Sequence, residues 1–141
     1  NYATENGTVV IAASGNDNSG SVSYPSDYSN CISVGALSPC NERKSTSSCD
    51  GENFWGSNYG SGLDFLAPGV RIHTTTMNGS YTSTFNGTSS ACPQAAGIAG
   101  LIKSESNNIS AYDVRLLMCA QEHLSSPNTL LMHSYYMPLP K

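Results

Sequence analysis

The chain has 141 residues, enough for one domain or part of one and fewer than most two-domain enzymes contain. Charged residues make up only 11% and the formal net charge is -4, so the basic surface that binds nucleic acids or anionic membranes is missing. No apolar run approaches the ~20 residues of a membrane-spanning helix, so neither nucleic acid nor a membrane is an expected partner.

The first half of the chain predicts short, buried strands. Residues 8–13 form a continuous run of small and β-branched side chains that ends in a turn, as buried parallel strands do. Two more strands are expected at residues 31–36 and 63–67. Pro68-Gly69 closes the last of these before residues 70–75 resume an extended pattern.

The stretch from Ser38 to Gly62 is polar and rich in glycine. It is predicted to be a surface excursion that contains an insertion, in which Phe54, Trp55 and Tyr59 are the only obvious packing groups. Little of this segment is therefore expected to be ordered by apolar burial.

Five cysteines occur, and only Cys40 and Cys49 are spaced as a pair. A bridge between them would contribute ~2 to 3 kcal/mol, while two free surface thiols remain the alternative. Four triplets have the pattern of glycosylation acceptors, at Asn6, Asn78, Asn86 and Asn108. Together these features favour an extracellular or secretory-pathway location, with any export signal expected upstream.

The second half of the chain predicts two helices. From Ser89 onward, alanine and glycine crowd a segment that indicates a central, buried helix with very close neighbours, and Pro93 is expected in its first turn. Residues 110–113 are typical of a helix start, and apolar residues follow at helical spacing. Strands alternating with helices predict an α/β fold.

Two short motifs carry the functional argument. Residues 86–93 have the sequence Asn-Gly-Thr-Ser-Ser-Ala-Cys-Pro, and residues 12–16 have the sequence Ala-Ala-Ser-Gly-Asn. They resemble the segment around the nucleophilic serine of subtilases and the strand end that supplies an oxyanion-hole asparagine in that family. Three further stretches fall in the family's order, at residues 23–26, 32–36 and 66–70.

This resemblance covers about residues 7–122, and it implies a three-layer α/β subtilisin-like fold with a mostly parallel sheet that is incomplete on its N-terminal side. It assigns residues 1–124 to the C-terminal part of a subtilase catalytic domain and leaves residues 125–141 as an unassigned tail. The implied activity is that of a serine endopeptidase. Ser89 would form the acyl-enzyme, while Asn16 and the Ser89 backbone N–H would stabilise the oxyanion.

The same resemblance also implies a substrate-binding pocket. Residues 13–15 would line one wall of the primary specificity pocket, with Ser23 near its base, so the substrate-binding candidates are Ala13, Ser14, Gly15 and Ser23. A polypeptide is the expected substrate.

The family's catalytic aspartate and histidine are missing. Neither an Asp-x-Gly nor a His-Gly-Thr motif occurs, and none of His73, His123 and His133 stands in a subtilase context. These groups are expected from an upstream part of the same catalytic domain, so the chain alone is predicted to be inactive. The motif also departs from the family pattern at Ser90, where methionine is usual, and at Gln94, where histidine is usual. Cys92 replaces an ordinary small residue.

Other interpretations remain beside this one. Taken singly, Ser89 would be a helix N-cap and Asn16 a turn residue, and only their joint occurrence favours catalysis. An α/β-hydrolase is disfavoured because the Gly-x-Ser-x-Gly elbow is missing, whereas a non-catalytic pseudopeptidase or peptide-binding module is the main alternative. The chemistry requires no cofactor. Structural calcium is common in the family, but the acidic residues show no ligand-like spacing, so no metal site is predicted.

Overall fold

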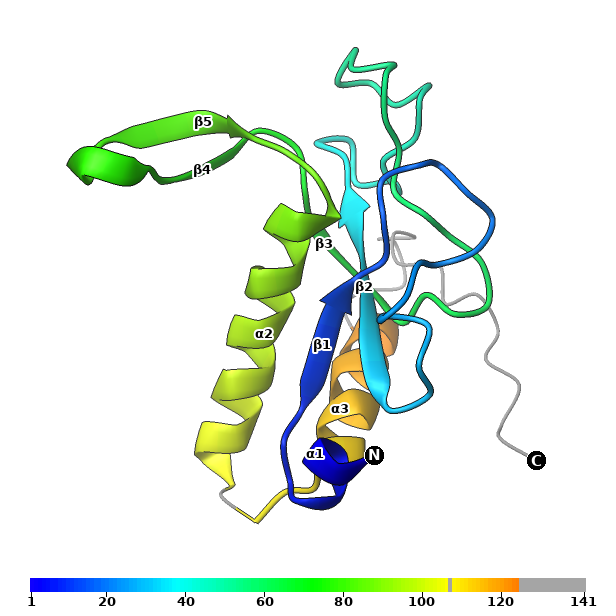
Figure 1. Ribbon diagram of the computed structural model, residues 1–141, viewed down its shortest axis with the longest axis vertical. Helices are drawn as coiled ribbons and strands as arrows, with labels where there is room; N and C mark the ends of the chain where they lie inside the picture. Colours follow the sequence, from blue (N-terminus) through cyan, green and yellow to red (C-terminus); the bar gives the residue numbers. More distant parts are fainter. Residues whose placement is uncertain (107, 125–141) are drawn as a thin grey trace.

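The computed structural model describes residues 1–106 and 108–124 (Figure 1). Its centre is a parallel three-stranded sheet in the order β1-β2-β3. These strands span Val10–Ala13, Cys31–Leu37 and Phe65–Pro68. The predicted strands are thus confirmed to within two residues at each end, since an apolar run bounded by turn residues marks a buried strand locally.

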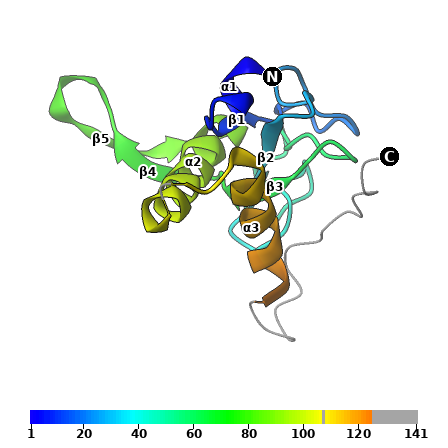
Figure 2. The ribbon, with the colours of Figure 1, turned by 90° about the horizontal axis from the view of Figure 1, so that it is seen from below.

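Two long helices pack against this sheet and against each other. Helix α2 (Thr88–Glu105) contacts all three strands, and α3 (Ala111–Leu124) packs beside α2 (Figure 2). A short helix, α1 (Tyr2–Glu5), contacts α3. The α/β class and the mostly parallel sheet are therefore confirmed.

The extended pattern at residues 70–75 corresponds to a strand that lies outside the central sheet. Strand β4 (Ile72–Thr75) pairs antiparallel with β5 (Tyr81–Phe85), and the 3₁₀ turn η1 (Met77–Gly79) joins them. This hairpin projects from the body of the molecule (Figure 1). Strand β5 was not predicted, although Asn-Gly between two threonine-rich runs is a strong hairpin signal.

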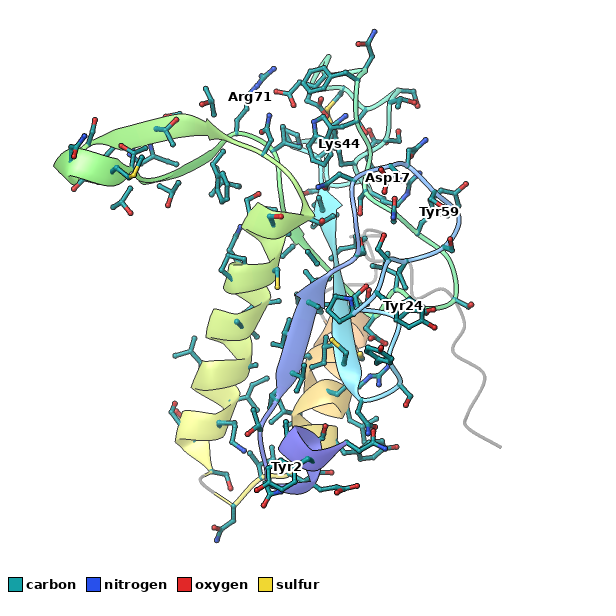
Figure 3. All side chains as sticks on the ribbon, viewed as in Figure 1. Tyr2, Asp17, Tyr24, Lys44, Tyr59 and Arg71 are labelled. Carbon is teal, nitrogen blue, oxygen red and sulfur yellow. A yellow bond between two sulfur atoms is a disulfide. The ribbon has the colours of Figure 1, made fainter. Side chains whose placement is uncertain are left out.

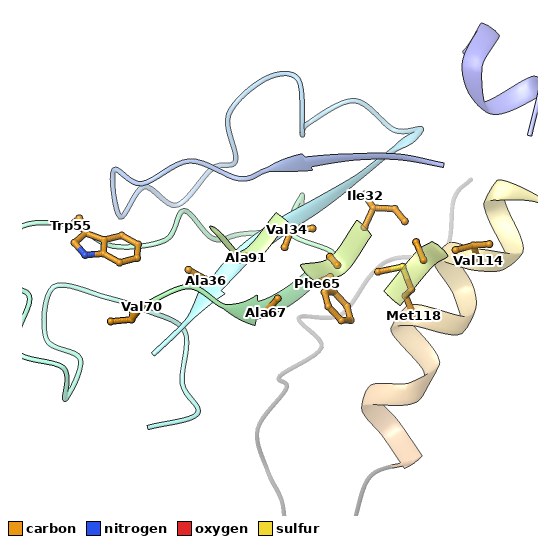
Figure 4. Close-up of a cluster of buried hydrophobic side chains, with 12 residues drawn as sticks. Ile32, Val34, Ala36, Trp55, Phe65, Ala67, Val70, Ala91, Val114 and Met118 are labelled. Carbon is orange, nitrogen blue, oxygen red and sulfur yellow. The ribbon is translucent and has the colours of Figure 1, made fainter. Parts of the chain in front are cut away.

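The core lies between β2, β3 and the two long helices (Figure 4). Strand β2 runs through the middle of the sheet, and its first six residues are buried. Small residues of α2 allow the helix to approach the strands closely, because a larger side chain there would hold the two backbones apart. The buried cluster consists of Ile32, Val34, Ala36, Trp55, Phe65, Ala67, Val70, Ala91, Ala95, Ala99, Val114 and Met118.

Helix α2 differs in two ways from the prediction. Only one of its faces is buried, and on the other Ile98 and Leu101 are 39% and 69% exposed. The helix also begins at Thr88, which puts Pro93 at the sixth helical position rather than in the first turn. Because proline has no N–H, the carbonyl of Ser89 loses its intrahelical donor. The predicted burial of this helix therefore holds for the face that carries Ala91, Ala95 and Ala99, and not for the outer face, which none of the described residues covers.

The start of α3 follows the predicted pattern. The Asp113 N–H donates to Ser110 Oγ at 3.0 Å, and Ser110 Oγ–H donates to Asp113 Oδ2 at 2.6 Å. This reciprocal cap satisfies an N–H group that would otherwise have no intrahelical partner. Val114 and Met118 then enter the core, as expected of an amphipathic helix.

Candidate functional site

The amino-terminal end of α2 begins at a sharp glycine turn. Gly87, the N-cap residue, has φ 113°, a conformation that side chains disfavour, and its N–H donates to the Gly69 carbonyl at 2.9 Å. This bond ties the start of α2 to the segment that follows β3. Ser89 thereby lies in the first turn of the helix, near N–H groups that lack intrahelical acceptors.

The two adjacent serines have different environments. Ser90 is 1% exposed, and its hydroxyl lies 2.8 Å from the Gly87 carbonyl and 3.2 Å from the Gly69 carbonyl. Ser89 is exposed, and no residue in the described part of the chain forms a hydrogen bond with its hydroxyl. Ser90 is therefore a structural residue that fixes the glycine turn, whereas Ser89 presents a free hydroxyl.

Asn16 lies beyond the carboxyl end of β1 and contacts the start of α2. Its Oδ1 accepts hydrogen bonds from the Thr88 backbone N–H at 2.8 Å and from Thr88 Oγ1–H at 3.1 Å. Thr88 Oγ1 in turn accepts from the Gly15 N–H at 3.3 Å. Because both bonds from Thr88 use the oxygen of the Asn16 amide, its Nδ2 group is left to donate elsewhere.

The position above Gly87 is bordered by the side-chain amide of Asn16 and by the backbone N–H of Ser89. A Cβ atom built on Gly87 would be 3.4 Å from Asn16 Oδ1, 3.5 Å from Asn16 Nδ2 and 3.6 Å from the Ser89 backbone nitrogen. Two N–H donors therefore lie close together at this turn, while the Asn16 amide oxygen is used by Thr88. The adjacent helix N-terminus favours negative charge at the same point. This arrangement is suited to stabilising an oxyanion beside the Ser89 hydroxyl.

The four predicted pocket residues lie in different environments. Ala13 ends β1 and is half-buried, while Ser14 is fully buried with its Oγ 3.4 Å from the Asn58 carbonyl. Ser23 is exposed, and its Oγ accepts from Asn58 Nδ2 at 3.2 Å. Ser14 is thus withdrawn from the surface, whereas Ser23 is exposed and Ala13 and Gly15 are partly exposed.

The segment at residues 38–62 contains buried polar groups that the sequence analysis did not anticipate. Cys40 and Cys49 are joined by a disulfide, with Cα atoms 6.4 Å apart, which decides between the two alternatives left open. Inside this loop, Lys44 and Asp50 form a fully buried ion pair at 3.3 Å. Lys44 Nζ also donates to the Glu52 carbonyl at 2.6 Å. This part of the chain, in which Figure 3 labels Lys44, is therefore ordered around a charge.

Glu52 connects this loop to the residue at the start of the predicted nucleophile motif. Its Oε2 accepts from Trp55 Nε1 and from Asn86 Nδ2, both at 2.8 Å, and its Oε1 lies 3.4 Å from Arg71 Nε. The Arg71 N–H donates to Asn86 Oδ1 at 2.6 Å, so both ends of the Asn86 amide are held. The Trp55 hydrogen bond, helped by Asn86 and Arg71, holds the pKa of Glu52 below its ordinary value.

Among the described residues, the histidine side chain that the structure places is that of His73. His73 is exposed on β4, where its Nδ1 lies 2.9 Å from Ser83 Oγ and its ring stacks on Tyr81. The side chain of His123 and all of His133 lie outside the described residues. Within residues 1–106 and 108–124, no three His, Cys, Asp or Glu side chains gather as a metal site would require. No helix in that part is both long and apolar enough to cross a membrane.

Comparison with known proteins places the chain in a family. A family model described as the subtilase family matches residues 1–131. The chain belongs to the subtilase family. It is 43% identical over 115 residues to Subtilisin Savinase of Lederbergia lenta, which covers 82% of this chain and 39% of that protein. The M-protease of Shouchella clausii (strain KSM-K16) shows the same identity over 82% of this chain and 27% of its own length.

A solved structure gives the same result for the subtilase fold. A cold-adapted subtilisin-like serine proteinase superimposes with a TM-score of 0.72 and 29% identity over 84% of this chain and 40% of that one. The subtilisin-like fold, with an incomplete sheet, is thereby confirmed. The chain spans between 27% and 40% of the length of these relatives.

Proposed function

We propose that this subtilase chain carries the nucleophile and the oxyanion hole of a serine endopeptidase. The supporting observation is that Asn16 Nδ2 and the Ser89 N–H lie together at the Gly87 turn, next to a hydroxyl without a partner among the described residues. Two N–H donors beside an exposed, unbonded serine hydroxyl are suited to acyl transfer.

The reaction would proceed through an acyl-enzyme. Ser89 Oγ attacks the scissile carbonyl of a polypeptide and gives its proton to a histidine supplied from outside these residues, with an aspartate orienting that histidine. The carbonyl oxygen becomes negatively charged above Gly87, where Asn16 Nδ2 and the Ser89 N–H donate to it. The histidine then protonates the leaving amine, and water, deprotonated by the same histidine, hydrolyses the ester. This chemistry requires no cofactor.

The surface of the chain is consistent with a catalytic domain completed by additional residues. Strand β1 is apolar, lies at the edge of the sheet and is only half-buried, while the outer face of α2 exposes Ile98 and Leu101. We propose that an upstream part of the same domain covers both and supplies the aspartate and histidine. An exported protein with an extracellular role fits the disulfide between Cys40 and Cys49.

The first test compares the two adjacent serines in the complete protein. Ser89→Ala should lower kcat by several orders of magnitude at nearly unchanged KM and abolish labelling by a fluorophosphonate, because the nucleophile acts in the chemical step. Ser90→Ala is the matched control and should keep most of the activity. Full turnover by a folded Ser89→Ala variant would exclude the proposed mechanism.

The second donor of the oxyanion hole can be tested separately. Asn16→Ala should lower kcat by about 10² to 10³, the loss measured for one oxyanion-hole donor in subtilisin. Circular dichroism would confirm that the variant is folded. The 141-residue chain by itself should show no turnover of a fluorogenic peptide, and complete labelling of that chain by a fluorophosphonate would instead show a base within it.

A further inference from the structure

Asn58 lies beneath the loop that carries Asn16. It belongs to the segment at residues 38–62, is 1% exposed and is one of the larger fully buried side chains. The 14–23 loop, defined as residues 14–23 between β1 and the Tyr24–Pro25 turn, packs against it. A buried amide is costly unless its polar atoms are bonded, so the partners of Asn58 indicate what it holds in place.

The hydrogen bonds of Asn58 reach both sides of Asn16. Its Oδ1 accepts from the Asp17 N–H at 2.9 Å and the Ser19 N–H at 3.0 Å. Its backbone N–H donates to the Gly15 carbonyl at 2.9 Å. One residue thus bonds the peptide groups immediately before and after Asn16.

The same side chain also fixes the far end of the loop. Asn58 Nδ2 donates to Ser23 Oγ at 3.2 Å. Gly15 has φ 106°, and a Cβ on it would clash with Asn58 Nδ2 and lie 2.6 Å from Ser23 Oγ. The loop therefore closes over Asn58 at a residue without a side chain, directly beside Asn16.

We propose that Asn58 is a positioning residue that holds Asn16 in place as an oxyanion donor, an inference that rests on the proposed peptidase function. Asn16 is exposed, and within the described part of the chain its side chain is bonded only through Oδ1, to Thr88. The direction of its Nδ2 group therefore depends on the backbone on either side, which Asn58 bonds. Displacement of a transition-state donor by about 1 Å can cost on the order of 100-fold in rate.

A double-mutant cycle in the complete protein tests this coupling. Asn58→Ala should lower kcat by about 10- to 100-fold when Asn16 is present. In the Asn16→Ala background it should lower kcat by less than about threefold, because the donor it positions is already gone. An equal loss in both backgrounds would overturn the proposal, since a general loss of stability would act regardless of Asn16.

Two further variants separate positioning from simple loss of a buried bond. Asn58→Asp keeps the acceptors for the Asp17 and Ser19 N–H groups and can accept from the Ser23 hydroxyl, so it should recover part of kcat, with the remaining loss due to the carboxylate that it buries. Ser38→Ala is the matched control, because Ser38 is 4% exposed and its Oγ accepts from the Cys40 N–H, away from the 14–23 loop. It should leave kcat unchanged. If Asn58→Ala does not fold, Asn58→Ser replaces it in the cycle.

Amide hydrogen exchange gives a readout that does not depend on activity. Asn58→Ala should accelerate exchange at Asp17 and Ser19, whose N–H groups lose their acceptor, while Ser38→Ala should not. Unchanged exchange at both positions would overturn the proposal. A complete protein without peptidase turnover would count against the proposed function instead, and the exchange experiment would still decide whether Asn58 holds the loop.

Discussion

The two sides of the candidate site are held by different kinds of chemistry, although both anchors come from residues 38–62. On the side of the 14–23 loop, the anchor is the neutral, fully buried amide of Asn58. On the side of the nucleophile, the anchor is Glu52, whose carboxylate holds Asn86 and pairs with Arg71 at a partly exposed position.

This difference predicts how each side responds to conditions. Hydrogen bonds of a buried neutral amide do not titrate and are not screened by salt. An ion pair near the surface weakens with salt and with protonation of its carboxylate. The 14–23 loop should therefore keep its geometry over a wide range of pH, whereas the segment before Ser89 should be the condition-sensitive side.

The largest effect is expected from removing Lys44, which holds the loop that presents Glu52. Lys44→Met leaves Asp50 as a buried charge without its partner, and breaking such a pair costs about 3 to 5 kcal/mol of unfolding free energy. Denaturant unfolding should be measured in the Ser89→Ala background to prevent self-digestion. Exchange should accelerate at Gly87 more than at Asp17.

The matched control for Lys44 removes both charges. Lys44→Met combined with Asp50→Asn should regain a large part of the lost stability, because no uncompensated charge stays buried. A double variant as unstable as Lys44→Met would show that lost packing, rather than the charge, dominates. Equal acceleration of exchange at Gly87 and Asp17 would contradict the division of the site into two separately anchored sides.

A smaller effect is expected from opening the disulfide. Replacing both Cys40 and Cys49 with serine should lower the unfolding free energy by about 2 to 3 kcal/mol, because a bridge across a separation of nine residues restricts the unfolded chain. Mild reduction of the native protein should have the same effect. Burial raises the pKa of the Cys31 and Cys92 thiols, so these should react slowly with thiol reagents. Unchanged stability of the serine variant would show that Lys44 alone orders the loop.

Local patterns explain which features the sequence could predict. The strand before Asn16, the strand at Cys31 and the cap at Ser110 each depend on neighbouring residues, so their patterns are visible in a short window. Cys40 and Cys49 are also close in sequence, and they form a disulfide in the structure. The motifs around Asn16 and Ser89 placed the candidate site in the chain because the family keeps them in order.

The remaining features depend on side-chain partners that no pattern of residue types reveals, about 40 positions away for Asn58 and within 11 positions for Lys44. Asn58 and Lys44 are polar residues in a glycine-rich stretch, for which exposure to solvent is the ordinary expectation. Their burial follows from bonds to residues up to about 40 positions away in the case of Asn58, which no local pattern reveals. The exposure of the outer face of α2 could not be predicted either, because a helix buried on all sides would have the same small and apolar residues.

The smallest effect, and the clearest test of the charged side, is expected from Glu52→Gln. Glutamine can still accept from Trp55 and Asn86 but loses the ion pair with Arg71, so the loss of unfolding free energy should stay within about 1 kcal/mol.

The folded-state pKa of Glu52 lies below its ordinary value, so its carboxylate stabilises the fold at pH values above the ordinary glutamate pKa. That stabilisation is lost as the pH falls through the lower, folded-state pKa. The unfolding free energy of the native protein should therefore exceed that of the Glu52→Gln variant most clearly near neutral pH and at low salt. In acid the two unfolding free energies should become equal. Asn58→Asp introduces a carboxylate on the side of the 14–23 loop. The pH dependence of its unfolding free energy can be compared with that of the native protein. A difference between Glu52→Gln and the native protein that stayed constant from neutral to strongly acidic pH would show that the Glu52 anchor does not depend on its charge.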